Sequence, residues 1–180
     1  KTTLLRTVLG ELPMQTGEIR WNGALVDDPK AFFVPPRCAY TPQVPRLFSE
    51  TLADNILMGL SGGAQELAQA VELGVMEEDL PTLELGLQTM VGPRGVKLSG
   101  GQVQRTAAAR MFVREADLYV FDDLSSALDV ETENVLWDRV FAARQGASLV
   151  VSHRRPALQR ADQIIVLKDG RVEAVGALDE

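Results

Sequence analysis

The sequence has 180 residues, of which 46% are hydrophobic and 24% charged, an ordinary balance for a globular domain with one substantial core. Its formal net charge of −7 argues against a general nucleic-acid-binding protein, which would carry a basic face. The only cysteine, Cys38, excludes an internal disulfide and a cysteine-based zinc site, and no apolar run approaches the ~18 residues that span a bilayer.

The first forty residues combine one helical pattern with two short extended patterns. Apolar side chains at helical spacing predict a helix over residues 1–9, and Gly10 is suited to cap its C-terminus. Residues 17–23 predict a short strand that enters an Asn-Gly turn. Residues 38–42 predict another strand, which Pro42 stops.

The stretch from Gln43 to about Gly95 differs in composition, because it consists of short helical patterns broken by glycines. One of these patterns covers residues 64–71 and ends near Gly74. We therefore predict that residues 43–95 form a helical subdomain inserted into a core of residues 1–42 and 96–180. The insertion contains no long heptad array.

The run Leu98-Ser99-Gly100-Gly101-Gln102 predicts the start of a helix that binds phosphate. Ser99 can cap this helix, and Gln102 stands three residues on, where the partner in a capping box is found. Two glycines in a first helical turn cost about 2 kcal/mol relative to two alanines, so local stability does not explain them. They do let an anion approach the backbone at the positive end of the helix dipole.

Strand and helix patterns alternate in the rest of the chain. Residues 118–121 form a continuous apolar run, which suits a parallel strand buried on both faces, and the run closes on Asp122-Asp123. The remaining predicted elements are a helix over residues 131–143, a second buried strand over 148–151, and a hairpin formed by 163–167 and 171–175. Strands that alternate with helices indicate an α/β sheet.

These motifs resemble the pattern of the ATP-binding cassette (ABC) ATPases. Matching segments occur in the family's order at Lys1-Thr2-Thr3, Gln43, 98–102, Asp122-Asp123, 126–129 and His153. Each segment is a weak signal alone, but chance rarely produces all of them in this order, and they span almost the whole chain. The resemblance implies an α/β fold with a P-loop NTPase (RecA-like) core and parallel sheet, a small antiparallel β part and an inserted α-helical subdomain.

The resemblance places the start of the chain inside the P-loop. Lys1-Thr2 match only the end of the pattern G-x-x-x-x-G-K-[ST]. We therefore expect residues 1–180 to be one ABC ATPase domain, a fragment whose N-terminal strands and glycine-rich loop lie upstream of residue 1. Taken alone, a Lys-Thr pair is better explained as a solvated helix start, so this assignment depends on the other motifs.

The resemblance also implies the ligands, which are ATP and Mg²⁺. The residues expected to contact ATP are Lys1, Thr2, Thr3, Ser99, Gly100, Gly101 and Gln102. Mg²⁺ would be held by the Thr2 hydroxyl, Gln43 and Asp122, since oxygen ligands suit this ion. Gln43 and Asp123 would orient and polarise the attacking water, and His153 would contact the γ-phosphate. Without the resemblance, Gln43 would be a turn residue, a lone histidine at a strand end such as His153 is usually structural, and an aspartate after a strand such as Asp122 is commonly a helix cap.

Asp123 departs from the family pattern, in which competent sites usually carry glutamate. Aspartate is shorter by one methylene, about 1.5 Å of reach, and a displacement of ~1 Å can cost about a hundredfold in rate. Two interpretations remain open. Asp123 is a slow catalytic base of an ATP hydrolase, or the site binds ATP and hydrolyses it poorly beside a complete site in a heterodimer.

A second copy of such a domain is the partner that the resemblance implies. In the family, residues matching Ser99 to Gln102 contact ATP held by the opposite subunit, so two cassettes enclose two nucleotides head to tail. Ser126 and Asp129 would then lie at the dimer interface. We expect a homo- or heterodimer that is largely monomeric without ATP and dimeric with it.

The segments beside the helical insertion resemble those of exporter-type cassettes. Residues 47–56 match the region where membrane domains dock, so transmembrane domains are expected to contact the region around residues 44–58. Residues 92–97 resemble a second exporter segment, in which Pro93 replaces the usual acid. Because proline also removes a backbone donor, the pattern does not support contact of this segment with the opposite membrane domain.

The function implied is that of the ATP-binding and ATP-hydrolysing domain of an ABC transporter, of exporter type, at the cytoplasmic face of the cell membrane. One alternative is a regulatory, mainly ATP-binding cassette of a heterodimeric transporter. A less favoured alternative is a cassette ATPase that acts on nucleic acid. Such proteins need long heptad arms or basic linkers, and this acidic sequence has neither, so we expect no nucleic-acid partner.

Overall fold

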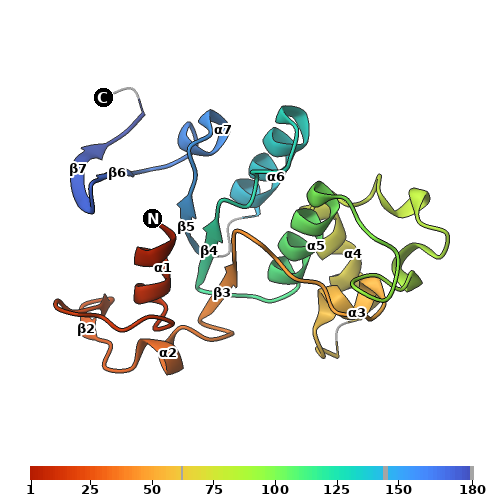
Figure 1. Cartoon of the computed structure of the whole chain (residues 1–180), viewed down its shortest axis with the longest axis horizontal. Coiled ribbons are helices and arrows are strands. Elements are labelled where there is room, and N and C mark those ends of the chain that lie inside the picture. Colours follow the sequence, from red (N-terminus) through yellow and green to blue (C-terminus); the bar gives the residue numbers. More distant parts are fainter. Residues whose placement is uncertain (62, 144–145, 179–180) are drawn as a thin grey trace.

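The computed structural model describes residues 1–61, 63–143 and 146–178. A three-stranded parallel sheet lies at its centre, in the order β3 (Cys38–Thr41), β4 (Leu118–Asp122) and β5 (Ala147–Val151). Helix α1 (Thr2–Val8) packs on one face of the sheet, and α5 (Gly100–Phe112) and α6 (Val130–Ala142) pack on the other (Figure 1). This arrangement confirms the predicted α/β fold with its parallel sheet.

Strand β4 is buried on both faces, as its apolar sequence predicts. Tyr119 and Phe121 share one hydrophobic cluster with Trp137 of α6. Val120 packs on the opposite face with Leu5 of α1. Because successive side chains of a strand point to opposite faces, this one strand anchors both helical layers.

The predicted burial of the strand over residues 148–151 is wrong. Strand β5 is present and pairs in parallel with β4, but Ala147, Ser148 and Leu149 are exposed. Within the described residues β5 is the edge of the sheet, and it borders a cavity of about 880 Å³ that residues of α1 and β6 (Ile164–Lys168) also line. An apolar run indicates that a strand is hydrophobic. It does not indicate whether another strand or helix packs against that strand.

Two antiparallel hairpins complete the β structure. Strands β1 (Arg20–Trp21) and β2 (Ala24–Leu25) pair around Asn22-Gly23, and β6 pairs with β7 (Arg171–Gly176) around Asp169-Gly170. All four turn residues have positive φ, from 49° to 83°. Such turns match the right-handed twist of the flanking strands, which is why the sequence predicts both hairpins.

Five helical segments lie between β3 and β4 in the described part of the chain. They are α3 (Leu52–Leu57), α4 (Ala64–Leu73), the 3-10 helices η1 (Leu80–Thr82) and η2 (Gly86–Gln88), and then α5. The remaining helices are α2 (Pro29–Phe32) and α7 (Arg155–Leu158). None of the helices in the described part of the chain is long and apolar enough to cross a bilayer.

Helix α5 contacts both parts of the molecule. Its Ala109 packs with Ile56 of α3 and Val71 of α4 in the cluster that holds the helical region together. Its Ala108 packs in the other direction, in the cluster that includes Phe121 of β4. The division of the chain at residue 95 stays a prediction, since the packing of α5 continues across it.

Replacement of Trp137 by alanine should lower the free energy of unfolding by about 3–5 kcal/mol, because a cavity would open in the core. Trp137 is fully buried, and its ring meets Phe121 edge-on at a centroid distance of 5.4 Å. Urea unfolding followed by circular dichroism measures the loss. Trp21, which is only partly buried on the β1–β2 hairpin, is the control, and equal losses at the two positions would contradict this account of the core.

Candidate functional site

The carboxyl ends of all three parallel strands and the start of α1 meet at one edge of the sheet. A cavity of about 320 Å³ there is lined by Lys1, Thr2, Thr3, Gln43, Asp122, Asp123, Val151, Ser152 and His153. Every residue that the sequence assigns to the P-loop, to Mg²⁺ or to catalysis is in this set. The convergence follows from topology, since ligands of open α/β sheets bind outside the carboxyl ends of the strands.

The larger cavity beside β5 is a different environment. Aliphatic side chains of β5 and β6 form much of its wall, and Thr2, Gln43 and Asp122 do not line it. The smaller cavity is therefore the candidate site, because it collects the polar groups that could act on a phosphate.

Thr2 and Asp122 lie in direct contact within the candidate site. The Thr2 hydroxyl donates a hydrogen bond to Asp122 Oδ1 over 3.0 Å. Asp122 is 1% exposed, and its second oxygen, Oδ2, is buried without a hydrogen-bond partner among the described residues. A buried carboxylate oxygen without a donor is costly unless a ligand meets it. The hydroxyl and carboxylate oxygens therefore fit a hard cation such as Mg²⁺.

Asp123 lies between Gln43 and His153. Its Oδ2 accepts a hydrogen bond from Gln43 Nε2 over 3.4 Å, and its Oδ1 lies 3.7 Å from His153 Nδ1. This Oδ1 is also buried without a hydrogen-bond partner in the described part of the chain. The structure thus brings together the three side chains predicted to be catalytic, and His153, whose side chain is 71% exposed, remains open to a ligand.

The backbone at Asp123 adopts a conformation that few residue types tolerate. Its φ is 54°, and its amide donates to the carbonyl of Val151 over 2.9 Å at the end of β5. Aspartate and asparagine are enriched several-fold in this left-handed region, where other side chains meet steric cost. The turn therefore aims the Asp123 carboxylate toward Gln43 and His153 instead of continuing the strand.

The run from Ser99 to Gln102 begins α5 with the predicted capping box. The Gln102 amide donates to Ser99 Oγ over 3.2 Å, and the Ser99 amide donates to Gln102 Oε1 over 2.9 Å. These residues do not line the candidate site around Asp122. Within one copy of the chain, the two predicted halves of the nucleotide site therefore stay apart.

A buried ion pair that the sequence does not predict supports this helix start. Asp79 accepts two hydrogen bonds from Arg105, each 2.8 Å, and a third from Gln102 Nε2 over 3.2 Å. The ion pair is largely buried, with 14% of the Arg105 side chain and 13% of the Asp79 side chain exposed. An acid and a base 26 residues apart leave no local pattern, so only the folded chain shows that they hold Gln102 in place.

The predicted interface residues Ser126 and Asp129 lie on the loop between β4 and α6. Gln104 of α5 donates to Ser126 Oγ over 2.8 Å and accepts from the Ala127 amide over 2.9 Å. Asp129 caps α6, and the hydrogen bonds from the amide and hydroxyl of Thr132 hold the pKa of Asp129 below its usual value. The loop is thus fixed at both ends while Asp129 and Ser126 stay exposed.

The two segments that resemble those of exporters lie side by side. The Arg94 amide of the second segment donates to Ser49 Oγ of the first over 3.2 Å, and the Leu52 amide donates to the carbonyl of Thr89, just before the second segment. Phe48, which is 53% exposed, projects from the first segment. The predicted docking region thus exposes Phe48 and Val44, whereas Leu52 and Ile56 are buried beneath it.

Asn55 and Arg110 hold the first of these segments, and neither was singled out from the sequence. Asn55 accepts from the Phe48 amide over 2.8 Å and donates to the Phe48 carbonyl over 3.0 Å. Arg110 of α5 donates to the carbonyl of Asn55 over 2.7 Å, and burial lowers the pKa of its guanidinium. The helix that begins at Ser99 thus contacts the predicted docking region directly.

Comparison with known proteins identifies the family. The family model described as "ABC transporter" matches residues 1–126. The chain is 35% identical to "ABC transporter C family member 13" of Oryza sativa subsp. indica, over 100% of this chain and 11% of that protein. It is 34% identical to "Probable multidrug resistance ABC transporter ATP-binding/permease protein YheI" of Bacillus subtilis (strain 168), over 100% of this chain and 31% of that protein.

A solved structure gives the same result for the fold. "Structure of a bacterial Atm1-family ABC exporter with ATP bound" superposes with a TM-score of 0.86 at 29% identity, covering 98% of this chain and 31% of that chain. The chain thus spans 11% to 31% of the length of these relatives. We conclude that the chain belongs to the ABC transporter family.

Proposed function

We propose that the chain binds ATP together with Mg²⁺ and hydrolyses it to drive an exporter at the cytoplasmic face of a membrane. The observation that carries this proposal is the meeting of Thr2, Asp122, Gln43, Asp123 and His153 at one sheet edge. Catalysis of phosphoryl transfer is mainly positioning and charge stabilisation, which is what such an edge supplies.

Each residue of the site has a proposed task. Lys1 neutralises the β- and γ-phosphates, and Thr3 lies beside it. Thr2, Asp122 and Gln43 would hold Mg²⁺, which when bound neutralises phosphate charge. Asp123 Oδ1, the buried oxygen without a donor, would accept a proton from the attacking water. His153, whose Nδ1 faces Asp123, leaves Nε2 to donate to the terminal phosphate.

The partner we propose is a second ABC cassette. Ser99, Gly100, Gly101 and Gln102 form a helix start suited to phosphate, yet they do not line the cavity that contains Lys1. ATP bound at Lys1 of one copy would therefore meet this helix start of another, with Ser126 and Asp129 at the interface. Transmembrane domains would dock on residues 44–58, where Phe48 and Val44 are exposed.

The proposal is tested on the full-length protein that contains this chain. Hydrolysis of ATP should require Mg²⁺, and analytical ultracentrifugation should show dimers when ATP is present and hydrolysis is blocked. Binding of a fluorescent ATP analogue is measured in parallel. Absence of affinity for adenine nucleotide, or persistent monomers at saturating ATP, would overturn the proposal.

Gly100→Ala should stabilise the isolated fold and weaken the ATP-driven dimer. A methyl at Gly100 would lie 3.5 Å from Ala127 Cβ, an ordinary contact, so alanine should add about 0.5–1 kcal/mol to the free energy of unfolding. The same methyl blocks the approach of phosphate to the backbone, so dimer affinity should fall about tenfold, or 1.4 kcal/mol. Urea unfolding and ultracentrifugation measure the two effects.

The control for this substitution is Gly63→Ala, at the start of α4. It changes a glycine at another helix start, where nothing predicts phosphate binding, and should leave dimer affinity unchanged. A Gly100→Ala variant that dimerises as well as the wild type would show that this helix start does not contact the nucleotide.

A regulatory cassette that binds ATP and hydrolyses it slowly is the second candidate. Asp123 favours it, because the shorter carboxylate stands where competent members of the family usually carry glutamate. An ATPase that acts on nucleic acid has no comparable support, given the net charge of −7.

A further inference from the structure

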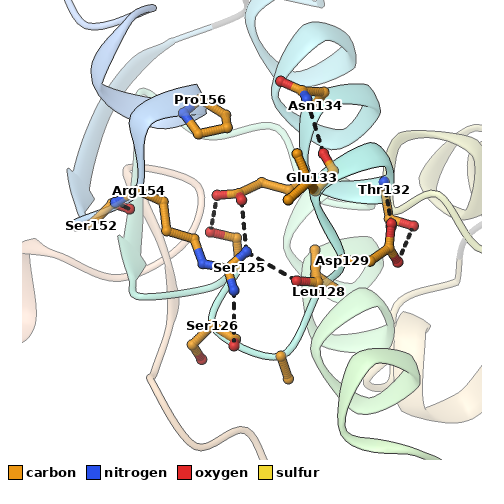
Figure 2. Close-up of polar contacts among 12 residues, drawn as sticks. Ser125, Ser126, Leu128, Asp129, Thr132, Glu133, Asn134, Ser152, Arg154 and Pro156 are labelled. Atoms are coloured by element: carbon orange, nitrogen blue, oxygen red, sulfur yellow. Dashed lines mark hydrogen bonds and ion pairs between the residues drawn. The ribbon is translucent and has the colours of Figure 1, made fainter.

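Arg154 follows His153 directly, and its side chain points into the loop between β4 and α6 (Figure 2). Its NH1 donates to the Leu128 carbonyl over 3.0 Å, and its NH2 donates to the Ser126 carbonyl over 3.4 Å. Its backbone amide donates to Ser152 Oγ over 3.0 Å. Arg154 does not line the cavity that holds Asp122, so it contacts the loop and not the candidate nucleotide site.

The same guanidinium neutralises a buried acid. Glu133 of α6 is 1% exposed, and its Oε2 accepts from Arg154 NH1 over 2.8 Å. Its Oε1 accepts from Ser125 Oγ over 2.6 Å and from Trp137 Nε1 over 3.3 Å. A carboxylate so completely removed from water needs a cation and hydrogen bonds, and here Arg154 is that cation.

Three parts of the molecule are therefore joined at one side chain. The backbone of Arg154 continues from His153, its guanidinium holds two carbonyls of the loop, and Glu133 fixes it to α6 (Figure 2). The loop carries Ser126 and leads back to Asp123, whose Oδ1 lies 3.7 Å from His153 Nδ1. A planar fork can hold all these acceptors at once, whereas a lysine ammonium offers one point charge.

We propose that Arg154, held by its ion pair with Glu133, is a positioning residue. It fixes the position of His153 relative to Asp123 and to the loop between β4 and α6. This inference rests on the proposed function. Arg154 acts through His153, so its loss should slow hydrolysis and leave the binding of ATP at Lys1 and Thr2 unchanged. A displacement of about 1 Å at a reacting group can cost up to a hundredfold in rate.

The test compares the full-length wild type with Arg154→Lys. We expect kcat for ATP hydrolysis to fall about tenfold, with the KM for ATP and the affinity for a fluorescent ATP analogue unchanged. Turnover is expressed per folded, nucleotide-competent molecule, so a purely structural defect does not lower it. An unchanged kcat in Arg154→Lys, or a matching loss of ATP affinity, would overturn the inference.

Arg160→Lys is the matched control. Arg160 also tethers the segment after β5 to α6, because its guanidinium bonds Asp138 over 2.6 Å and the Pro156 carbonyl over 2.7 Å. Its side chain is 25% exposed, against 26% for Arg154, but its guanidinium donates to Asp138 and Pro156 and not to the loop over residues 125–128. Its kcat should match that of the wild type, and an equal loss would show a general effect of the segment.

A double-mutant cycle with His153 separates positioning from general destabilisation. In the His153→Ala background, Arg154→Lys should cause no further loss of turnover, since the group it positions is gone. Losses that multiply would contradict the inference. If Arg154→Lys folds poorly, Arg154→Gln/Glu133→Gln removes both buried charges, and its kcat should still be low because the single NH2 group of the shorter glutamine cannot replace the guanidinium at both loop carbonyls. If the wild type binds no ATP, the proposed function itself is overturned. If the wild type hydrolyses ATP and Arg154→Lys is equally active, this inference alone is overturned.

Discussion

Asp122→Asn should reduce Mg²⁺-dependent ATP hydrolysis by about two to three orders of magnitude, because loss of this proposed metal ligand would remove several kcal/mol of charge stabilisation. Asparagine keeps the shape of the side chain and can still accept the hydrogen bond from Thr2, so the fold should survive. What disappears is the negative charge at Oδ2, the buried oxygen that has no donor among the described residues. Turnover by the full-length protein as a function of Mg²⁺ concentration measures the effect.

Asp117→Asn is the matched control for this substitution. Asp117 lies just before the other end of β4 and is exposed, so the same chemical change occurs on the same strand far from the site. Its turnover and Mg²⁺ dependence should equal those of the wild type. Full activity of Asp122→Asn would show that this carboxylate does not hold the metal.

The sequence indicates that the candidate residues come together, because each sits at the end of a local element, whereas their proposed roles come from the resemblance to ABC ATPases. Asp122 closes an apolar strand, His153 follows the next strand, and Thr2 begins a helix. Parallel strands end at the same edge, so residues far apart in the chain are brought together by topology alone. The capping box of Ser99 and Gln102 is local as well, and it forms as predicted.

Side-chain pairs that join distant elements could not be predicted in this way. Arg105 and Asp79, and likewise Arg154 and Glu133, are ordinary charged residues in the sequence, and their burial appears only in the folded chain. The exposure of β5 could not be predicted for the same reason. The residues around Leu149 form a strand whether or not another element covers it, and here Leu149 is exposed. The local sequence pattern thus predicts the helices and strands and the polar residues at their ends. Which charged residues are buried in ion pairs depends on contacts between distant parts of the chain.

The second large effect is expected at Asp123. Asp123→Glu adds about 1.5 Å of reach toward the attacking water, which should raise turnover by up to about a hundredfold. The substitution also strains the backbone. A φ of 54° costs a residue other than aspartate, asparagine or glycine about 1 kcal/mol of stability. That strain lowers stability, whereas the added reach acts on the rate, so urea unfolding and kcat should change in opposite directions.

Asp123→Asn and Asp123→Ala decide between the two interpretations of this site. Asparagine tolerates the same φ and can keep the contact with Gln43, so it removes only the carboxylate charge and the proton acceptor. If Asp123 is a slow base, both variants should lose at least about tenfold in turnover, in line with the contribution of a general base. If hydrolysis occurs instead at a complete site on a partner cassette, the glutamate, asparagine and alanine variants should all turn over like the wild type while still binding ATP. The two interpretations therefore differ in the role of one atom, Asp123 Oδ1. This oxygen is buried beside His153 and has no hydrogen-bond donor among the described residues.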